Sequence, residues 1–198
     1  MRLIQGLRRL FARIIRRKDK PPADLWAPVP QRVPLQRFGA GAVRDFRWYF
    51  EGESAVSVSS VDEMCDWLLA CEYIRDRDLF HESDFWQHPR TFEQVRKGDC
   101  EDHAIWAWRK LVEMGFDAEL VTGEVLRDDG KTISHVWVLF SQQDVQYLLE
   151  STAGSREAML RPVAEVRARY VPHWGITGTL ESRGYPGFFA RRQSSGAR

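Results

Sequence analysis

The segment 98–149 constrains the fold of this chain more than any other part of the sequence. A helical pattern at 100–114 is followed by three apolar runs rich in β-branched residues, at 118–126, 133–140 and 145–149. Short polar connections join these runs, as in an antiparallel meander. One helix followed by such a meander predicts an α+β fold with the helix packed on the sheet.

The length and composition of the chain predict one main domain. Its 198 residues are 43% hydrophobic, which is sufficient for a single core. We expect that domain at 45–187. Residues 21–44 are expected to form a proline-rich linker or strap, because 21–34 hold five of the nine prolines. Residues 188–198 are expected to be a flexible tail.

The first twenty residues differ from the rest of the chain in charge. Residues 1–20 hold eight Lys or Arg against one Asp, a net charge of +7, which leaves −6 for the other 178 residues. Leu3, Leu7, Leu10 and Ile14 fall on one side of a helix, so this segment predicts a basic amphipathic helix. It could contact an anionic membrane surface or an acidic protein, or pack on its own acidic domain. The acidic body argues against a nucleic-acid partner.

The cysteines and the absence of long apolar stretches favour a cytoplasmic protein, with peripheral membrane association through 1–20 as an option. Three cysteines are an odd number in a chain too large to need disulfides. No apolar run approaches the roughly 18 to 20 residues of a membrane span, and no cleavable secretion signal is evident. Cys65 and Cys71 lie on a helix predicted behind Ser60 and are expected to be packing residues.

Three further local predictions follow from residue patterns. Alternating aromatic residues at 44–51 indicate a short strand. The segment 155–170 indicates a late helix. His81, His88 and His173 have no ligand spacing and are expected to be surface or loop residues.

Cys100 stands where a helix can make a thiol reactive. Asp99 is expected to cap the helix that begins at Cys100, and the exposed N–H groups of a helix N-terminus lower the pKa of a nearby thiol. The acidic neighbours Asp99, Glu101 and Asp102 oppose the thiolate by like-charge repulsion, so some other group must offset them. A nucleophilic thiol also needs a base and a group that orients the base.

The meander supplies candidates for both. A hairpin centred on 142–143 would make His135 and Glu150 direct cross-strand neighbours, with Trp137 on the same face. A carboxylate there can fix the imidazole tautomer and stabilise the imidazolium. The residues alone therefore propose Cys100 as nucleophile, His135 as base and Glu150 as orienter.

These motifs resemble a known family. The sequence "GDCEDHA", followed by "HVWV" and "YLLEST", resembles bacterial transglutaminase-like cysteine peptidases, relatives of the papain-like fold, over 84–152. The resemblance implies hydrolysis of a peptide bond in a protein or peptide substrate through Cys100, His135 and Glu150, with a thioester intermediate. The family usually has Asp where this chain has Glu150. Amine transfer, as in a transglutaminase, and a catalytically silent peptide-binding module remain alternatives.

An oxyanion site and a metal site complete the predicted set of site residues. The backbone N–H of Cys100 is the expected first donor to an oxyanion, and Gln87 or the indole of Trp86 are candidates for the second. Some members of the family depend on calcium through acids beside their cysteine, which makes Asp99 and Glu101 candidate calcium ligands. No other cofactor is expected.

A zinc hydrolase is the rival chemistry. Its candidate ligands are Cys100 and His103, one helical turn apart, together with His135. The residues expected to support the site by packing, without taking part in the chemistry, are Asp102, Trp137 and Thr152.

Overall fold

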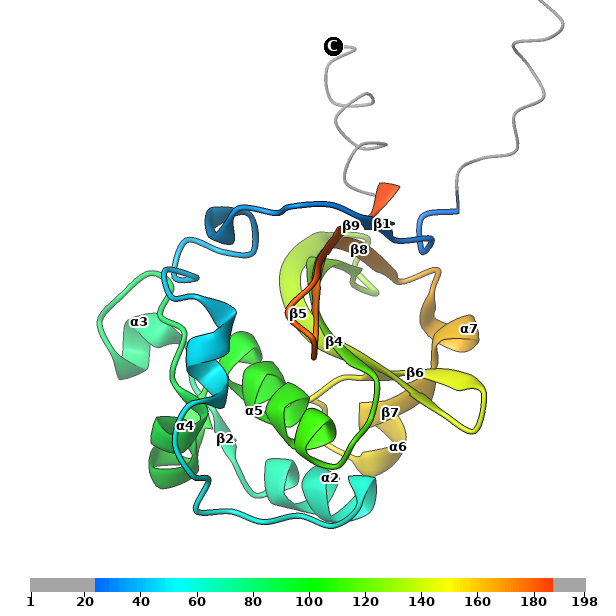
Figure 1. Cartoon of the computed structure of the whole chain (residues 1–198). Helices are drawn as coiled ribbons and strands as arrows, with labels where there is room; N and C mark the ends of the chain where they lie inside the picture. Colours follow the sequence, from blue (N-terminus) through cyan, green and yellow to red (C-terminus); the bar gives the residue numbers. More distant parts are fainter. Residues whose placement is uncertain (1–23, 187–198) are drawn as a thin grey trace, which may run out of the picture.

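The computed structural model describes residues 24–186, so the helix predicted at 1–20 and the tail predicted at 188–198 lie outside the described residues. Within the described part, no helix is both long and apolar enough to cross a membrane. The described chain forms a curled sheet on one side of a central helix, and the short helices of residues 61–95 lie on the other side (Figure 1). This arrangement confirms the predicted α+β class.

The sheet has seven strands in the order β1-β9-β8-β4-β5-β6-β7, and every neighbouring pair is antiparallel. The strands are β1 Val29–Pro30, β4 Ala118–Leu126, β5 Thr132–Gln142, β6 Val145–Leu149, β7 Leu160–Pro162, β8 Tyr170–Thr177 and β9 Ser182–Gly184. A separate parallel pair joins β2 (Glu72–Tyr73) to β3 (Lys97–Gly98). The meander predicted at 118–149 is therefore confirmed as β4, β5 and β6.

The central helix is α5, Cys100–Glu113, as the sequence pattern predicted. Met114 is the C-cap, and the chain leaves the helix at Gly115, which adopts a positive φ of 85°, the conformation that glycine tolerates after a helix. Trp106 and Trp108 on this helix have no solvent exposure. The remaining helices are α2 Val61–Leu69, α3 Asp76–Leu79, α4 Pro89–Val95, α6 Arg156–Met159 and α7 Val163–Val166, with two 3-10 helices, η1 Leu35–Arg37 and η2 Phe46–Phe50.

The alternation of β5 separates two hydrophobic clusters on the two faces of the sheet. Val136 and Val138 belong to the cluster that includes α5, whereas Trp137 and Leu139 pack in the second cluster with Val163. Successive strand residues point to opposite faces, so both faces of β5 are covered. The N-terminal end of α5 is thereby held against β5.

Two local predictions were wrong. The aromatic run at 44–51 forms η2 instead of a strand, because the Asp45 side chain accepts the N–H of Arg47 at 2.8 Å and starts a helical turn. The late helix predicted at 155–170 is divided into α6, β7 and α7. Pro162 ends β7 and then forms the N-cap of α7, which a single continuous helix could not accommodate.

The described part of the proline-rich segment packs on the domain. Val29 and Pro30 form β1, which pairs with β9 at the edge of the sheet. Val33 and Phe38 are buried in the main core, at 9% and 6% exposure. The described part of the segment thus runs beside the edge strand β9 (Figure 1). Arg37, at the end of η1, lines the cavity described next.

Candidate active site

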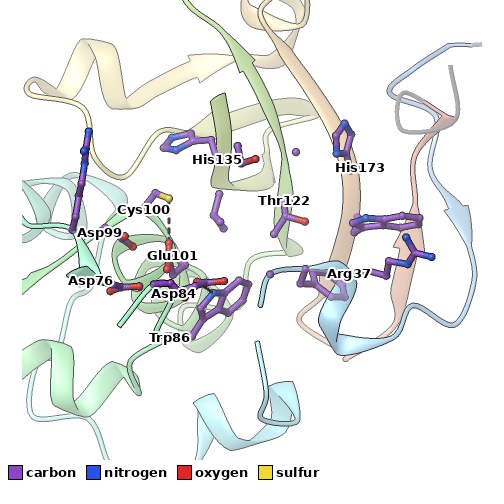
Figure 2. Close-up of a pocket in the computed structure, with 18 of the residues that line it drawn as sticks. Arg37, Asp76, Asp84, Trp86, Asp99, Cys100, Glu101, Thr122, His135 and His173 are labelled. Carbon is purple, nitrogen blue, oxygen red and sulfur yellow. Dashed lines mark hydrogen bonds between the residues drawn. The ribbon is translucent and has the colours of Figure 1, made fainter. Parts of the chain in front are cut away.

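The N-terminal end of α5 opens into a cavity of about 470 Å³ that Cys100 and His135 both line. Cys100 is the first residue of the helix, and Asp99 occupies the N-cap position, as predicted. Figure 2 shows the Cys100 sulfur and the His135 ring facing the same space. The structure therefore brings the predicted nucleophile and base to one cavity.

The turn before Cys100 is held by a buried carboxylate. Asp102 accepts the backbone N–H of Gln87 at 2.8 Å and that of Asp99 at 3.3 Å. A Cβ at Gly98 would come within 2.3 Å of the Asp102 carboxylate, so only glycine fits there. Burial raises the pKa of Asp102 to about 8, although the hydrogen bonds from Gln87 work in the opposite direction. Asp102 thus shapes the turn, which is the packing role predicted from the sequence.

His135 and Glu150 form a direct pair. The distance from His135 Nε2 to Glu150 Oε2 is 2.7 Å. Glu150 also accepts hydrogen bonds from the Thr152 hydroxyl at 2.6 Å and from the Tyr170 hydroxyl at 3.0 Å. Burial works to raise the pKa of Glu150, but the hydrogen bond and charge of His135 outweigh it, so this pKa lies below its ordinary value. Glu150 is therefore held as a carboxylate, and the second imidazole nitrogen, Nδ1, is left for the thiol.

The His135–Glu150 pair was predicted from a register of β5 and β6 that was wrong. The structure pairs Leu139 with Leu148, so the hairpin is centred on 143–144, one residue later than predicted. Both turn residues, Gln143 and Asp144, have positive φ, as a two-residue type I′ turn requires. The ladder ends before Glu150, and its carboxylate reaches His135 diagonally instead of from the directly opposed position.

The surroundings of Cys100 oppose its ionisation. Burial raises the pKa of the thiol well above its ordinary value, and the charges of Glu101 and Asp99 raise it further. The sulfur donates a hydrogen bond to Glu101 Oε2 at 3.2 Å. The backbone N–H of Val136 lowers the pKa but does not reverse the effect. The thiolate thus requires an additional positive charge or a proton acceptor nearby.

Acidic side chains cluster beside the thiol. Carboxylate oxygens of Asp76, Asp84 and Glu101 lie within 4.8 Å of one another, and so do those of Asp76, Asp99 and Asp102. Among the residues that the structure describes, Asp76 Oδ1 and Asp99 Oδ1 are buried without a hydrogen-bond partner. Burial raises the pKa of Asp76 to about 6. These oxygens suit a hard divalent cation such as calcium.

Asp76 and Asp84 were not predicted. They reach the cluster from α3 and from the loop before α4, whereas the two predicted calcium ligands, Asp99 and Glu101, adjoin Cys100 in the chain. Figure 2 shows all four carboxylates on one side of the cavity, close to Cys100. In the sequence, the cation site was indicated by the acidic residues beside Cys100. Asp76 and Asp84 were missed because neither α3 nor the loop before α4 has a recognisable spacing of metal ligands.

Both predicted side-chain oxyanion donors carry other hydrogen bonds. The Gln87 amide donates to Lys97 O at 2.9 Å and to Asp102 Oδ2 at 2.5 Å, and its side chain is buried. The Trp86 indole lines the cavity but donates to Asp84 Oδ1 at 2.9 Å. The backbone N–H at the N-terminus of α5 therefore remains as the predicted donor to an oxyanion in the cavity.

The zinc ligand set is not brought together. His103 is buried against Phe92, and its Nδ1 is bonded to the carbonyl of Asp99 at 2.8 Å. No group of candidate metal ligands found in 24–186 combines His103 with Cys100 and His135. The prediction that His173 is a surface or loop residue was also wrong, since it lies on β8 and lines the cavity.

Comparison with known proteins agrees with this geometry. Residues 84–169 match the family model of the CEP76 peptidase-like domain, the stretch that holds Cys100, His135 and Glu150. The match to a peptidase-like domain is in line with the resemblance to transglutaminase-like cysteine peptidases, and the predicted layout, a cysteine-bearing helix packed on an antiparallel sheet, is confirmed. No curated protein matches the sequence significantly.

Three solved structures are similar at low identity. Calcium-bound LapG of Legionella pneumophila has a TM-score of 0.46 and 19% identity over 59% of this chain and 63% of that chain. The EGTA-treated form of LapG has a TM-score of 0.46 and 16% identity over 75% and 83%. A Cytophaga hutchinsonii protein, provisionally described as a cysteine protease, has a TM-score of 0.39 and 13% identity over 71% and 56%. The chain thus spans less than two thirds of calcium-bound LapG.

Proposed function

We propose that this protein is a cysteine peptidase that hydrolyses a peptide bond in a protein or peptide substrate. The observation that carries the proposal is the His135–Glu150 pair, 2.7 Å apart, beside the cavity where Cys100 begins α5. A nucleophile, a base and an orienting carboxylate are the three groups that acyl transfer through a thiol needs. The match to a peptidase-like family model supports the same reading.

The proposed route of the proton follows from the hydrogen bond that His135 already makes with Glu150. Because His135 Nε2 is bonded to Glu150, Nδ1 accepts the thiol proton as the Cys100 sulfur attacks the carbonyl carbon. The oxyanion is stabilised by the backbone N–H of Cys100 at the helix N-terminus. The imidazolium returns the proton to the leaving amine, which leaves a thioester on Cys100. Water, deprotonated by His135, then hydrolyses the thioester and restores the thiol.

A divalent cation, calcium by the chemistry of the donors, would be held by Asp76, Asp84, Asp99 and Glu101. When bound, it supplies positive charge that offsets the acids which now raise the pKa of the Cys100 thiol. The buried, unpartnered oxygens of Asp76 and Asp99 are the observation that fits such an ion.

The proposal is tested by labelling and by mapping cleavage. A thiol-reactive probe is expected to label Cys100 in preference to Cys65 and Cys71, since Cys100 shares a cavity with the proposed base His135, whereas Cys65 is buried in the core and the Cys71 thiol donates to the Trp67 carbonyl. His135→Ala is expected to reduce the labelling rate of Cys100 at least tenfold, because the proton acceptor is lost. Equal labelling of the three cysteines would contradict the proposed roles.

A second experiment separates peptidase from the alternatives. Wild-type protein and Cys100→Ala are incubated with a proteome, and new N-termini and new isopeptide links are identified by mass spectrometry. New N-termini that depend on Cys100 are the expected result. Isopeptide links would instead indicate amine transfer by the same thioester, and neither product would favour a catalytically silent peptide-binding module.

Calcium is expected to stabilise the protein. Adding calcium at 100 times its Kd stabilises a folded protein by about 2.7 kcal/mol, which should appear as a rise in Tm. Asp76→Asn is expected to raise the calcium concentration needed for half of the Tm rise at least tenfold, because it removes a carboxylate that belongs to both carboxylate groups of the cluster. Asp66→Asn, an exposed acid far along α2, serves as the control and should leave the calcium response unchanged. A Tm that is insensitive to calcium would refute the site.

A further inference from the structure

The proline-rich segment is bonded to the acidic cluster through one carboxylate, that of Asp84. Asp84 Oδ2 accepts the backbone N–H of Gly41 at 2.7 Å, and Asp84 Oδ1 accepts the indole N–H of Trp86 at 2.9 Å. A carboxylate oxygen of Asp84 also lies within 4.8 Å of one from Asp76 and one from Glu101. Figure 2 shows Trp86 beside Asp84 and the other carboxylates of the cluster. Asp84 therefore belongs to the cluster and at the same time holds the proline-rich segment.

The two hydrogen bonds leave Asp84 able to hold a cation. An ionised carboxylate has about four lone-pair sites, and the two donors occupy only two of them. Oxygens that bind one calcium ion at about 2.3–2.6 Å can lie up to about 5 Å apart, so the 4.8 Å spacing in the cluster suits a shared ion. Asp76, which is 2% exposed, has an Oδ1 without a hydrogen-bond partner in residues 24–186. That buried oxygen is the independent sign of an ion at this place.

The segment 38–43 fits closely against Asp84 and Trp86 because it has glycine at two positions. A Cβ at Gly41 would come within 2.5 Å of the Asp84 carbonyl oxygen and 2.9 Å of Trp86 Cδ1. A Cβ at Gly39 would lie 3.0 Å from Trp86 Cζ2. Neither glycine adopts a positive φ, so the close approach, and not the backbone conformation, requires glycine. This approach brings the Gly41 N–H to the carboxylate.

The same segment forms part of the cavity wall. Phe38 and Gly39 line the cavity together with Trp86. Phe38 is 6% exposed and packs edge-on against Phe46, with ring centroids 4.8 Å apart, and Phe46 packs edge-on against Trp86 at 6.2 Å. One wall of the cavity that Cys100 lines therefore depends on how the segment is held.

We propose that the N–H groups of Gly41 and Trp86 position Asp84 for a divalent cation, so that cation binding and docking of the 38–43 segment stabilise each other. Hydrogen bonds from outside the ligand set orient a ligating carboxylate, and their loss weakens metal binding by about 10- to 100-fold. Such coupling is reciprocal, so the docked segment is also more stable when the cation is bound. Trp86 is thus a positioning residue, and the cation fixes a wall of the cleft. The inference rests on the cation site of the proposed function and not on peptidase activity.

Hydrogen exchange measures the docking without any substrate. The full chain is exchanged in calcium chloride and in EGTA, and the fragments are analysed by mass spectrometry. Calcium is expected to slow exchange of the Gly41 amide, which donates to Asp84, by at least about tenfold. The control is the β5–β6 turn at 143–144, which lies at the opposite end of β5 from His135 and should exchange at the same rate in both solutions.

Replacing Trp86 tests the second hydrogen bond. Trp86→Phe keeps an aromatic ring but removes the donor to Asp84, so the calcium concentration needed for half of the Tm rise is expected to increase by at least about tenfold. A purely structural role would lower the Tm by similar amounts with and without calcium and leave that concentration unchanged. The control is Trp26→Phe, which removes an indole donor to the Arg167 carbonyl at 3.1 Å and should leave the calcium response as in wild type.

Replacing Gly41 tests the segment itself. In Gly41→Ala the new methyl group would meet the Asp84 carbonyl oxygen, so the segment must move away from Asp84. We expect calcium binding to weaken by at least about tenfold and the calcium effect on exchange of residues 38–43 to disappear. The control is Gly154→Ala, where a Cβ meets no atom within 4 Å, and it should change neither measurement.

Three results would overturn the inference. If calcium raises the Tm but leaves either the exchange of Gly41 or the calcium response of Trp86→Phe unchanged, the coupling is wrong while the cation site stands. Faster exchange of Gly41 in calcium would mean that the cation competes with the Gly41 N–H for Asp84. If calcium changes the Tm of neither the wild type nor any variant, the cation site and the coupling both fail, whereas the proposed roles of Cys100 and His135 are unaffected.

Discussion

Replacing Glu150 by glutamine is expected to lower kcat/KM by roughly 10³- to 10⁴-fold while the protein stays folded. Glu150 accepts hydrogen bonds from His135 Nε2, from Tyr170 and from Thr152. Glutamine has one acceptor oxygen and an NH₂ group. Because His135 and Tyr170 share Oε2 and Thr152 bonds to Oε1, either Thr152 or both His135 and Tyr170 lose their acceptor. An NH₂ facing Nε2 would select the tautomer that carries its proton on Nδ1, which cannot take the thiol proton. Steady-state kinetics on a substrate found by N-terminal mapping would measure the loss.

A matched control is available in the same cluster. Tyr170→Phe removes one of the donors to Glu150 and leaves the contact with His135 in place, so a loss of tenfold or less is expected. The Tm of both variants shows whether each remains folded. If folded Glu150→Gln kept kcat/KM within threefold of wild type, Glu150 would not orient the base, and the mechanism would reduce to Cys100 and His135.

The helix that carries the nucleophile was predictable because its signals are local. Asp99 before the helix and Gly115 after it mark the two ends, and both act at those positions in the structure. The pairing of His135 with Glu150 was also predicted, although from the wrong register. The prediction survived because a long carboxylate side chain can reach a diagonal neighbour as well as a directly opposed one.

The rest of the site depends on contacts that no local pattern reveals. Strand β8 was not predicted, because Pro172 and Gly175 interrupt its apolar pattern, yet it is an interior strand of the sheet and carries His173 into the cavity. Pro172 lies at the register shift of the β4–β8 ladder, where a missing N–H is tolerated. Asp76 and Asp84 likewise enter the site from segments whose positions are set by tertiary packing.

A buried ion pair holds the loop that covers the other end of α5. Lys110 and Glu93 have side chains that are 2% and 1% exposed, with Nζ and Oε1 3.5 Å apart. Lys110 also donates to the Val56 carbonyl at 2.6 Å and to Ser54, and Glu93 accepts the N–H groups of Ala55 and Trp106. The pair therefore joins the 54–56 loop to α4 and α5. Lys110 is also paired with Glu113 at 2.9 Å, whereas Lys110 is the cation that the structure places beside Glu93.

Lys110→Met is expected to lower the free energy of unfolding by about 3 to 5 kcal/mol, because it leaves Glu93 as a buried carboxylate without a cation. Adding Glu93→Gln should recover part of this loss, which a double-mutant cycle in urea would quantify. Arg161→Met is the control: its pair with Glu165 spans 2.8 Å but is about half exposed, so a change within about 0.5 kcal/mol is expected. A loss below 1 kcal/mol for Lys110→Met, or no recovery in the double variant, would mean that apolar packing around Trp106, and not the ion pair, holds this loop in place.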